Sequence, residues 1–145
     1  MIYTELTKKA INIAYKAHDG QLDRSGIPYI FHPMHIADQM TTEETCIVAI
    51  LHDVVEDTDV TLEELKEAGF GEDIIHAIDL LTHRDGVPYL DYVRALKDDP
   101  IASVVKLADL NHNSDRSRLS VITKKDEQRF LKYQKAKEIL QGIQK

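Results

Sequence analysis

The chain has 145 residues, of which 43% are hydrophobic and 30% charged, and its formal net charge is −7. This composition is typical of a globular protein, and the length predicts a single domain over residues 1–145. The negative charge argues against a nucleic-acid partner, which needs a basic face. No apolar run reaches the roughly 20 residues that span a bilayer, so no membrane partner is expected. The negative net charge does not exclude a small anionic substrate, because a bound divalent cation reverses the charge locally.

Two features bear on the compartment. Cys46 is the single cysteine, so an internal disulfide is excluded, and its apolar neighbours predict a buried side chain. The first residues lack the basic stretch and apolar core of a signal peptide. Both features favour a cytoplasmic protein.

Helical periodicity dominates the first third of the chain. Over residues 4–18, apolar side chains recur every three or four positions, which indicates one buried helix face. A loop is expected over 19–31, and Pro33 suits the first turn of a short helix with His32 at its entrance. Thr41 and Glu44 match a capping box that begins a helix ending near Val55.

The remainder of the chain also predicts helices. Residues 82–90 alternate only weakly and predict at most a short hairpin around Asp85 and Gly86. The other segments have helical spacing with capping residues or prolines at their starts, and we expect helices over residues 61–69, 72–82, 88–97, 100–111 and 123–142. The sequence therefore predicts an all-α bundle of seven or eight helices.

The helix expected over 41–55 changes character near its end. Its centre is apolar all round, and four ionisable residues then follow in one arc: His52, Asp53, Glu56 and Asp57. Burying these groups without partners would cost several kcal/mol. Either the arc faces solvent as the helix leaves the core, or a divalent cation binds there.

Two other segments place an ionisable residue beside apolar sequence, which favours the cation. His32 follows the segment 27–31, and Asp109 ends the apolar run 101–108. Two histidines and two aspartates form a mixed nitrogen and oxygen ligand set that suits Mn²⁺, Fe²⁺ or Zn²⁺.

The order of these residues resembles the HD phosphohydrolase superfamily. The closest resemblance is to the hydrolase domain of the Rel/Spo alarmone enzymes and to the small alarmone hydrolases, over roughly residues 3–140. It rests on three segments: Gly26-Ile27-Pro28-Tyr29-Ile30-Phe31-His32-Pro33, His52-Asp53-Val54-Val55-Glu56-Asp57-Thr58 and Lys106-Leu107-Ala108-Asp109. The resemblance implies an HD-type helical bundle that uses Mn²⁺ to remove the 3′-pyrophosphate from guanosine tetra- and pentaphosphate.

The resemblance also implies roles for single residues. The metal ligands would be His32, His52, Asp53 and Asp109. Glu56 and Asp57 match the catalytic acidic pair, and we hypothesise that Glu56 is the main base and Asp57 its helper. Asn113 matches a nucleotide contact, although an exposed Asn at a helix end is an equally good interpretation. Tyr29 is a further candidate for substrate binding, or else a packing aromatic residue.

Two positions depart from the alarmone enzymes. Asp23 and Asp115 stand where those enzymes usually carry arginine, which removes a phosphate or base donor and adds repulsion towards an anion. Neighbouring cations could rebuild a basic rim, and of these Arg24 and Arg116 are the substrate-binding candidates.

Three functions follow from these observations. The first is a 3′-pyrophosphohydrolase of the alarmone type. The second is an HD-type nucleotidase or phosphatase acting on another nucleotide. The third is a catalytically silent nucleotide-binding module, which the complete set of ligands and acidic residues argues against. The sequence predicts neither the oligomeric state nor which nucleotide binds.

Overall fold

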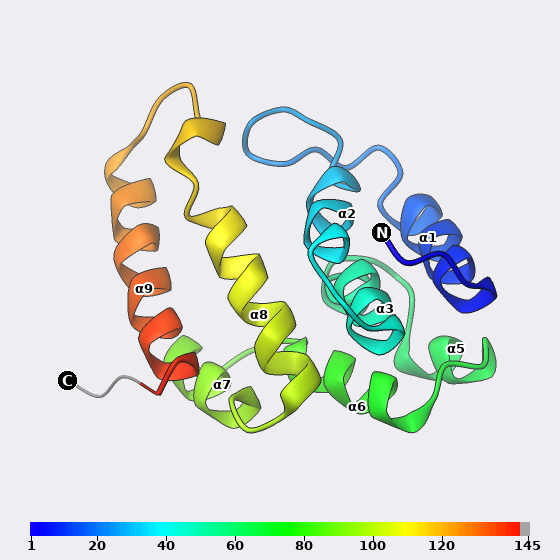
Figure 1. The fold of residues 1–145 in the computed structure, drawn as a ribbon. Coiled ribbons are helices and arrows are strands. Elements are labelled where there is room, and N and C mark those ends of the chain that lie inside the picture. The colour runs from blue at the N-terminus through cyan, green and yellow to red at the C-terminus, as the bar shows by residue number, and fades with distance from the viewer. Residues whose placement is uncertain (143–145) are drawn as a thin grey trace.

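The protein is all-helical in the part that the computed structural model describes, residues 1–142 (Figure 1). The helices are α1 (Glu5–Ala17), α2 (Phe31–Asp38), α3 (Glu43–Leu51), α4 (Val54–Asp57), α5 (Leu62–Glu67), α6 (Glu72–Leu81), α7 (Tyr89–Leu96), α8 (Pro100–Asn113) and α9 (Lys124–Leu140), with a 3₁₀ turn at Arg116–Arg118. Extended pairing within the described residues is limited to one bridge between Leu22 and Pro28. The predicted all-α fold is confirmed.

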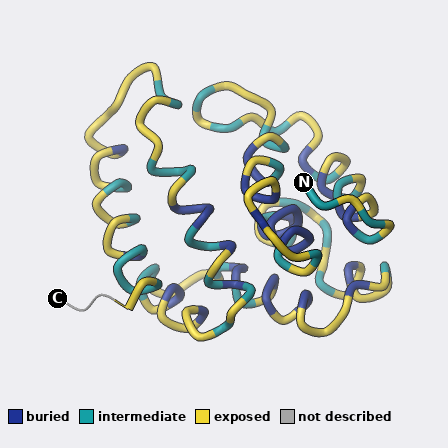
Figure 2. The backbone as a smooth tube through the Cα atoms, in the orientation of Figure 1, coloured by how far each residue is buried: buried dark blue, intermediate teal, exposed yellow. Residues whose placement is uncertain are grey.

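Helix α3 lies at the centre of the bundle. It packs against α1, α2, α6 and α8, and beyond its first turn it is buried and drawn dark blue in Figure 2. Residues 46–51 have no exposed surface, and Cys46 is among them. The strongly apolar sequence of this segment explains its position, because a helix that is hydrophobic all round is stable only when surrounded.

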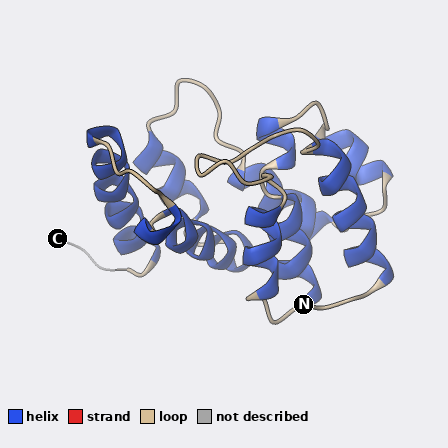
Figure 3. Ribbon diagram, turned by 90° about the horizontal axis from the view of Figure 1, so that it is seen from above, coloured by secondary structure: helices blue, strands red, loops and turns tan. Residues whose placement is uncertain are grey.

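Two long connections lie at the same end of the molecule. The loop of residues 18–30 precedes α2, and residues 114–123 join α8 to α9 (Figures 1 and 3).

None of the helices within residues 1–142 is long and apolar enough to cross a membrane.

The helix predicted over 41–55 is divided in two. Helix α3 ends at Leu51, His52 and Asp53 form a turn, and α4 begins at Val54. With α3 and α4 taken as one broken helix, the described residues contain eight α-helices. The N-cap of α3 also lies one residue later than predicted. The side chain of Thr42, rather than that of Thr41, accepts a hydrogen bond from the backbone N–H of Thr45.

Helix α2 also differs slightly from its prediction. It begins at Phe31, two residues before Pro33, so that His32 lies in the first turn. The backbone N–H of His32 donates to the carbonyl of Tyr29 at 3.0 Å, which continues the preceding turn into the helix.

The weak alternation over 82–90, which predicted at most a short hairpin around Asp85 and Gly86, does not produce one. The segment 82–88 is instead a loop, in which Gly86 has a φ of +82°. Side chains hold this loop in place: the Tyr92 hydroxyl donates to the carbonyl of Leu81, and His83 Nε2 lies 2.6 Å from the carbonyl of Val87. These two contacts, rather than pairing between strands, stabilise the loop.

Helix α8 carries Asp109, one of the four predicted metal ligands. Its N-terminus is capped by Asp99, whose carboxylate accepts from the N–H groups of Ile101 and Ala102, and Pro100 occupies the first helical position.

Replacing Asp99 with alanine should destabilise the protein by about 1 kcal/mol, the usual cost of losing a side-chain cap. Urea denaturation measures the change. The exposed neighbour Asp98, replaced in the same way, is the matched control and should alter stability by less than about 0.5 kcal/mol. Equal effects of the two substitutions would contradict the assigned cap.

Candidate metal centre

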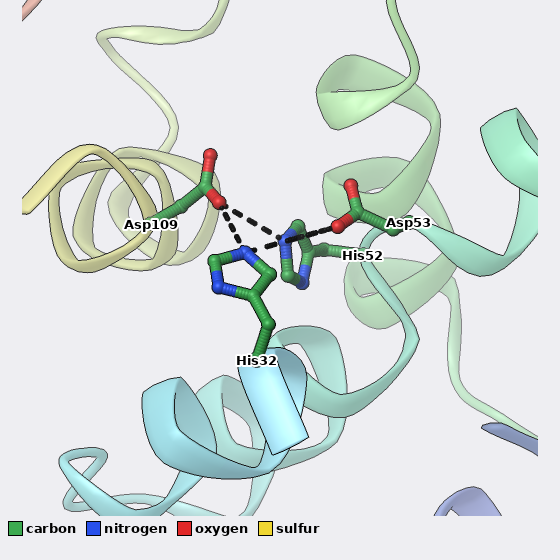
Figure 4. A group of neighbouring side chains, drawn as sticks. All are labelled: His32, His52, Asp53 and Asp109. Atoms are coloured by element: carbon green, nitrogen blue, oxygen red, sulfur yellow. Dashed lines mark hydrogen bonds and ion pairs between the residues drawn. The ribbon is translucent and has the colours of Figure 1, made fainter. Parts of the chain in front are cut away.

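The four predicted ligands lie together. One ligand atom from each of His32, His52, Asp53 and Asp109 can be chosen so that all lie within 4.8 Å of one another (Figure 4). Nε2 of His32 is 2.8 Å from Oδ1 of Asp109, and Nε2 of His52 is 3.0 Å from Oδ2 of Asp53. Three of the four are buried and Asp53 is partly buried, and residues 1–142 contain no second group of this kind.

The break between α3 and α4 brings two consecutive residues to one point. In a continuous α-helix, neighbouring side chains point about 100° apart. Here Asp53 has φ −101° and ψ −5°, in the bridge region between helix and extended structure. His52 and Asp53 therefore both face the cluster, with His32 from α2 and Asp109 from α8 completing it (Figure 4).

The cluster fits a divalent cation. Nδ1 of His52 lies 2.6 Å from the carbonyl of Ala49 and donates to it, which leaves the lone pair of Nε2 facing the carboxylates. This buried Nε2 makes no hydrogen bond to any residue of the described part of the chain. Carboxylate oxygens of Asp53 and Asp109 nevertheless lie 3.0 and 3.5 Å from it, and a metal ion held between the nitrogen and these oxygens would satisfy all of them. The donor set suits Mn²⁺, Fe²⁺ or Zn²⁺.

Each ligand except His52 has a side-chain partner behind it. The Tyr29 hydroxyl donates to Asp53. Lys106 Nζ donates to Oδ2 of Asp109 at 3.0 Å, and Asn113 Nδ2 donates to its Oδ1 at 3.1 Å. Nδ1 of His32 lies 2.7 Å from Nδ1 of His112. Such outer contacts fix the orientation of metal ligands.

The charges of the cluster stabilise one another. Burial opposes ionisation of Asp109, but the adjacent Lys106 ammonium and the two histidines hold its pKa well below the usual range. Burial likewise opposes the charge on His52, yet Asp53 and Asp109 raise its pKa well above the ordinary value. Without a cation, the two carboxylates therefore favour a protonated His52, and a bound metal ion would take the place of that proton. Lys106 adds a positive charge behind Asp109.

The predicted acidic pair lies beside the ligands on α4. Both side chains are exposed. Oε1 of Glu56 accepts a hydrogen bond of 2.6 Å from the backbone N–H of His83, whose ring stacks on Tyr92. For Asp57, desolvation by the surrounding protein atoms and the neighbouring carboxylates Asp53 and Glu56 raise the pKa to about 6, even though the residue keeps exposed surface.

The raised pKa of Asp57 has a consequence for stability. Ionised Asp57 is less favourable in the folded chain than in the unfolded chain, so stability falls as the pH rises from about 4 to about 6. In metal-free protein, Asp57→Asn should therefore be more stable than the wild type above about pH 6, by about 1 kcal/mol once solvent screening is considered.

Urea denaturation at several pH values measures this difference, which should vanish below about pH 4. Asp59→Asn, at an exposed carboxylate two residues on, is the matched control and should show no such dependence. A pH-independent difference for Asp57→Asn would contradict the prediction.

A cavity of about 230 Å³ adjoins the ligands. His32 is part of its wall, and so are three of the predicted substrate contacts, Arg24, Tyr29 and Asn113. The fourth, Arg116, is not: its guanidinium lies over the Phe130 ring and pairs with the Glu127 carboxylate at 2.6 Å. The structure thus brings three of the four candidates together.

Carboxylates neutralise the arginines of this cavity. Arg24 Nη2 lies 2.6 Å from the buried carboxylate of Asp126, which also pairs with Arg129 at 3.1 Å. Arg118 Nη2 lies 3.2 Å from Oδ2 of Asp23. The cavity therefore has aromatic and polar walls with little excess charge.

Asp23 has a structural role in the loop of residues 18–30. Its Oδ1 accepts hydrogen bonds from the backbone N–H groups of Ser25 and Ile27 and from the Ser25 hydroxyl, so it stabilises the turn before α2. The ion pair with Arg118 joins this loop to the segment that follows α8. Asp115 has a similar local role, accepting from the N–H and hydroxyl of Ser117.

Sequence reasoning missed Lys106 and His112. Lys106 belongs to the segment Lys106-Leu107-Ala108-Asp109, from which only Asp109 was predicted as a site residue, although the two side chains form an ion pair. The signal was available, because residues three apart on a helix share a face, and both Lys106 and His112 are three positions from Asp109 on α8.

The chain matches the model of a protein family described as "HD domain" over residues 10–108. The chain belongs to the HD-domain family. This match covers the segments that carry three of the four ligands, and Asp109 follows directly after it. The expected membership in this superfamily is confirmed.

Curated relatives connect the chain to alarmone enzymes. It is 36% identical to "Probable GTP pyrophosphokinase" of Mycobacterium leprae over 121 residues, which cover 74% of this chain and 15% of the relative. It is 33% identical to guanosine-3′,5′-bis(diphosphate) 3′-pyrophosphohydrolase of Aquifex aeolicus over 119 residues, which cover 74% of this chain and 17% of the relative. The chain thus spans about one sixth of the length of these relatives.

A solved structure has the same fold. It is described as a metazoan ortholog of SpoT that hydrolyzes ppGpp. The superposition has a TM-score of 0.77 and covers 99% of this chain and 89% of the other, at 22% sequence identity. The HD-type helical bundle expected from the sequence is confirmed by this likeness.

Proposed function

We propose that this protein is a metal-dependent phosphohydrolase that removes the 3′-pyrophosphate from guanosine tetra- and pentaphosphate. The convergence of His32, His52, Asp53 and Asp109, with a buried Nε2 of His52 that faces two carboxylates without a hydrogen bond, is the observation that carries the proposal. Relatives named as 3′-pyrophosphohydrolases support the substrate, and so does the fold shared with a ppGpp-hydrolysing protein. The proposed place of action is the cytoplasm.

The proposed metal is Mn²⁺, with Fe²⁺ and Zn²⁺ as alternatives that the same donors accept. The two histidines and two aspartates would hold it, and the outer contacts from Tyr29, Lys106 and Asn113 would keep the carboxylates in place. When bound, such a cation lowers the pKa of a coordinated water and polarises a phosphoryl oxygen.

The acidic pair would manage the proton of the attacking water. Water adds to the phosphorus of the 3′-ester and the bond to the ribose 3′ oxygen breaks. A carboxylate accepts a proton from the water, and the departing 3′ oxygen takes up a proton to become the 3′ hydroxyl. The hypothesis from sequence made Glu56 the main base. The structure supports a division of labour in which Glu56, held by the N–H of His83, orients the water. Asp57, with a pKa of about 6, is suited to accept the proton near neutral pH.

The cavity beside the ligands is the proposed place of the nucleoside. Arg24, Tyr29 and Asn113 form part of its wall, and Phe130 and Tyr133 add aromatic surface for a base. For Arg116, which pairs with Glu127 outside this wall, a substrate contact would require that ion pair to open.

A nucleotidase or phosphatase acting on another nucleotide is the second candidate. The pairing of the cavity arginines with Asp23 and Asp126 favours it, because a near-neutral wall attracts a second polyphosphate group only weakly. Against this stands the likeness to alarmone enzymes. The choice between the two depends on measured products.

One experiment separates the candidates. The protein is stripped with a chelator, reloaded with Mn²⁺ and incubated with a nucleotide panel that includes guanosine tetraphosphate. Pyrophosphate released from the tetraphosphate supports the first function, and orthophosphate released from ordinary nucleotides supports the second. Nucleotide binding without any release would show a silent module. Activity that survives complete removal of metal would contradict the proposed metal dependence.

A further inference from the structure

The two histidine ligands are oriented by different kinds of acceptor. His52 uses a backbone carbonyl, that of Ala49, at 2.6 Å from Nδ1. His32 uses another imidazole: its Nδ1 lies 2.7 Å from Nδ1 of His112, with ring centroids 5.0 Å apart and ring planes within 9° of each other. Nearly coplanar rings with facing nitrogens are the geometry of a hydrogen bond between them.

The direction of this hydrogen bond follows from the other nitrogen of His32. Nε2 faces the ligand cluster, 2.8 Å from Oδ1 of Asp109, so it is the atom whose lone pair a cation would take. The proton of a neutral His32 must then be on Nδ1. His32 therefore donates and His112 accepts, and His112 keeps its own proton on Nε2.

The surroundings hold the His112 ring in place. His112 lies on the last turn of α8, three residues after Asp109, so one helix presents both a ligand and the acceptor for a second ligand. Its ring stacks on that of His35, with centroids 4.1 Å apart. Arg118 Nη1 donates to its backbone carbonyl at 2.9 Å.

A direct substrate contact is less well supported for His112. The ring is not part of the wall of the cavity that Arg24 and Asn113 line. It lines a neighbouring groove instead, together with His35 and Phe31. Its link to the proposed metal centre is the contact between its Nδ1 and Nδ1 of His32.

We propose that His112 is a positioning residue that fixes the tautomer and ring orientation of His32, so that Nε2 of His32 is free to bind the metal. This inference rests on the proposed metal site. It does not depend on which nucleotide is cleaved. Loss of such an outer hydrogen bond typically weakens metal binding by about 10- to 100-fold.

Two polar replacements test the acceptor without removing polarity. In His112→Asn, the side-chain oxygen reaches about the position of Nδ1, whereas in His112→Gln the amide reaches about the position of Nε2. His35→Gln is the matched control, because His35 stacks on the same ring but has no hydrogen bond to a ligand. Isothermal titration calorimetry with Mn²⁺, and the visible absorption of the Co²⁺ form, measure binding without substrate.

We expect His112→Gln to bind Mn²⁺ about 10- to 100-fold more weakly than the wild type. His112→Asn and His35→Gln should stay within about threefold. The Co²⁺ spectrum should change only in His112→Gln. Thermal unfolding of the metal-free variants shows whether any loss of affinity comes from lost structure.

Three results would overturn the inference. The first is wild-type affinity in a folded His112→Gln variant. The second is an equal loss in the Asn and Gln variants, and the third is an equal loss in His35→Gln. A wild type that binds none of Mn²⁺, Fe²⁺ and Zn²⁺ would overturn the proposed metal centre and the role of His112 with it. A wild type that binds metal but spares guanosine tetraphosphate would overturn only the substrate.

Discussion

Asp109→Ala should weaken Mn²⁺ binding by at least about 100-fold, the upper end of the cost of losing only an outer partner. The metal-free variant should also lose about 3 kcal/mol of stability. Both effects have one origin, because the two oxygens of Asp109 have separate tasks. Oδ1 faces His32 and His52, and Oδ2 accepts from Lys106 at 3.0 Å. Alanine removes the ligand and leaves the Lys106 ammonium in a largely buried position without its carboxylate.

A second substitution separates the two effects. Lys106→Met keeps a long apolar side chain between the rings of Tyr89 and Tyr92, over which the ammonium lies at 5.6 and 5.2 Å from the centroids. Added to Asp109→Ala, it should restore most of the lost stability, because the stranded charge is gone. Metal affinity should not recover. Lys132→Met is the matched control, since Lys132 lies over the same Tyr89 ring but is exposed.

Calorimetry with Mn²⁺ and urea denaturation of the metal-free variants measure the two quantities. An Asp109→Ala variant as stable as the wild type would show that Lys106 does not depend on this carboxylate. A double variant that regains Mn²⁺ affinity would remove Asp109 from the ligand set.

Glu56→Gln and Asp57→Asn should each lower turnover by at least about 100-fold, the usual contribution of a positioned acid or base. Each should keep Mn²⁺ affinity within about threefold, because neither carboxylate is among the proposed ligands. The amides retain size and polarity but accept no proton. Glu56→Gln also keeps an oxygen for the N–H of His83, so its fold should be undisturbed.

The pH dependence distinguishes the two residues. If Asp57 accepts the proton, turnover of the wild type at saturating Mn²⁺ should fall with decreasing pH as this carboxyl becomes protonated. The midpoint should lie below the value of about 6 that applies without a cation, because a nearby divalent cation lowers the pKa of a carboxyl. The residual turnover of Asp57→Asn should lack that limb, whereas Glu56→Gln should keep it. Initial rates of pyrophosphate release across the pH range measure this, with Asp59→Asn as the control. Full activity of either variant would remove that residue from the proposed roles, and a limb that persists in Asp57→Asn would return the role of base to Glu56.

The sequence predicted the all-α fold and the segments that meet at the cluster, because helical spacing and capping residues are local signals. The start of α5 shows this, since Thr61 and Glu64 form a capping box at the beginning of the helix expected over 61–69. The division between α3 and α4 could not be predicted in this way. No glycine or proline marks it, and Asp53 departs only moderately from helical dihedral angles.

Contacts between distant segments were equally out of reach. Asp23 differs from the alarmone enzymes in charge, which suggested repulsion towards an anionic substrate. Its carboxylate in fact accepts from the turn that follows it and from Arg118, which is 95 positions away in the chain. Periodicity and capping patterns carry no information about such a pair. The same holds for Arg116, whose partner Glu127 and neighbour Phe130 lie on the next helix.

The division of the central helix also matters for protein design. The adjacent His-Asp pair converges on one point because the chain leaves regular helix between Leu51 and Val54. Grafting the two residues onto an unbroken helix of a new scaffold would direct their side chains about 100° apart and would not reproduce the cluster. A transfer of the pair would need the whole helix–turn–helix segment 43–57, and the scaffold would have to supply equivalents of His32, Asp109 and the Tyr29 hydroxyl from other segments.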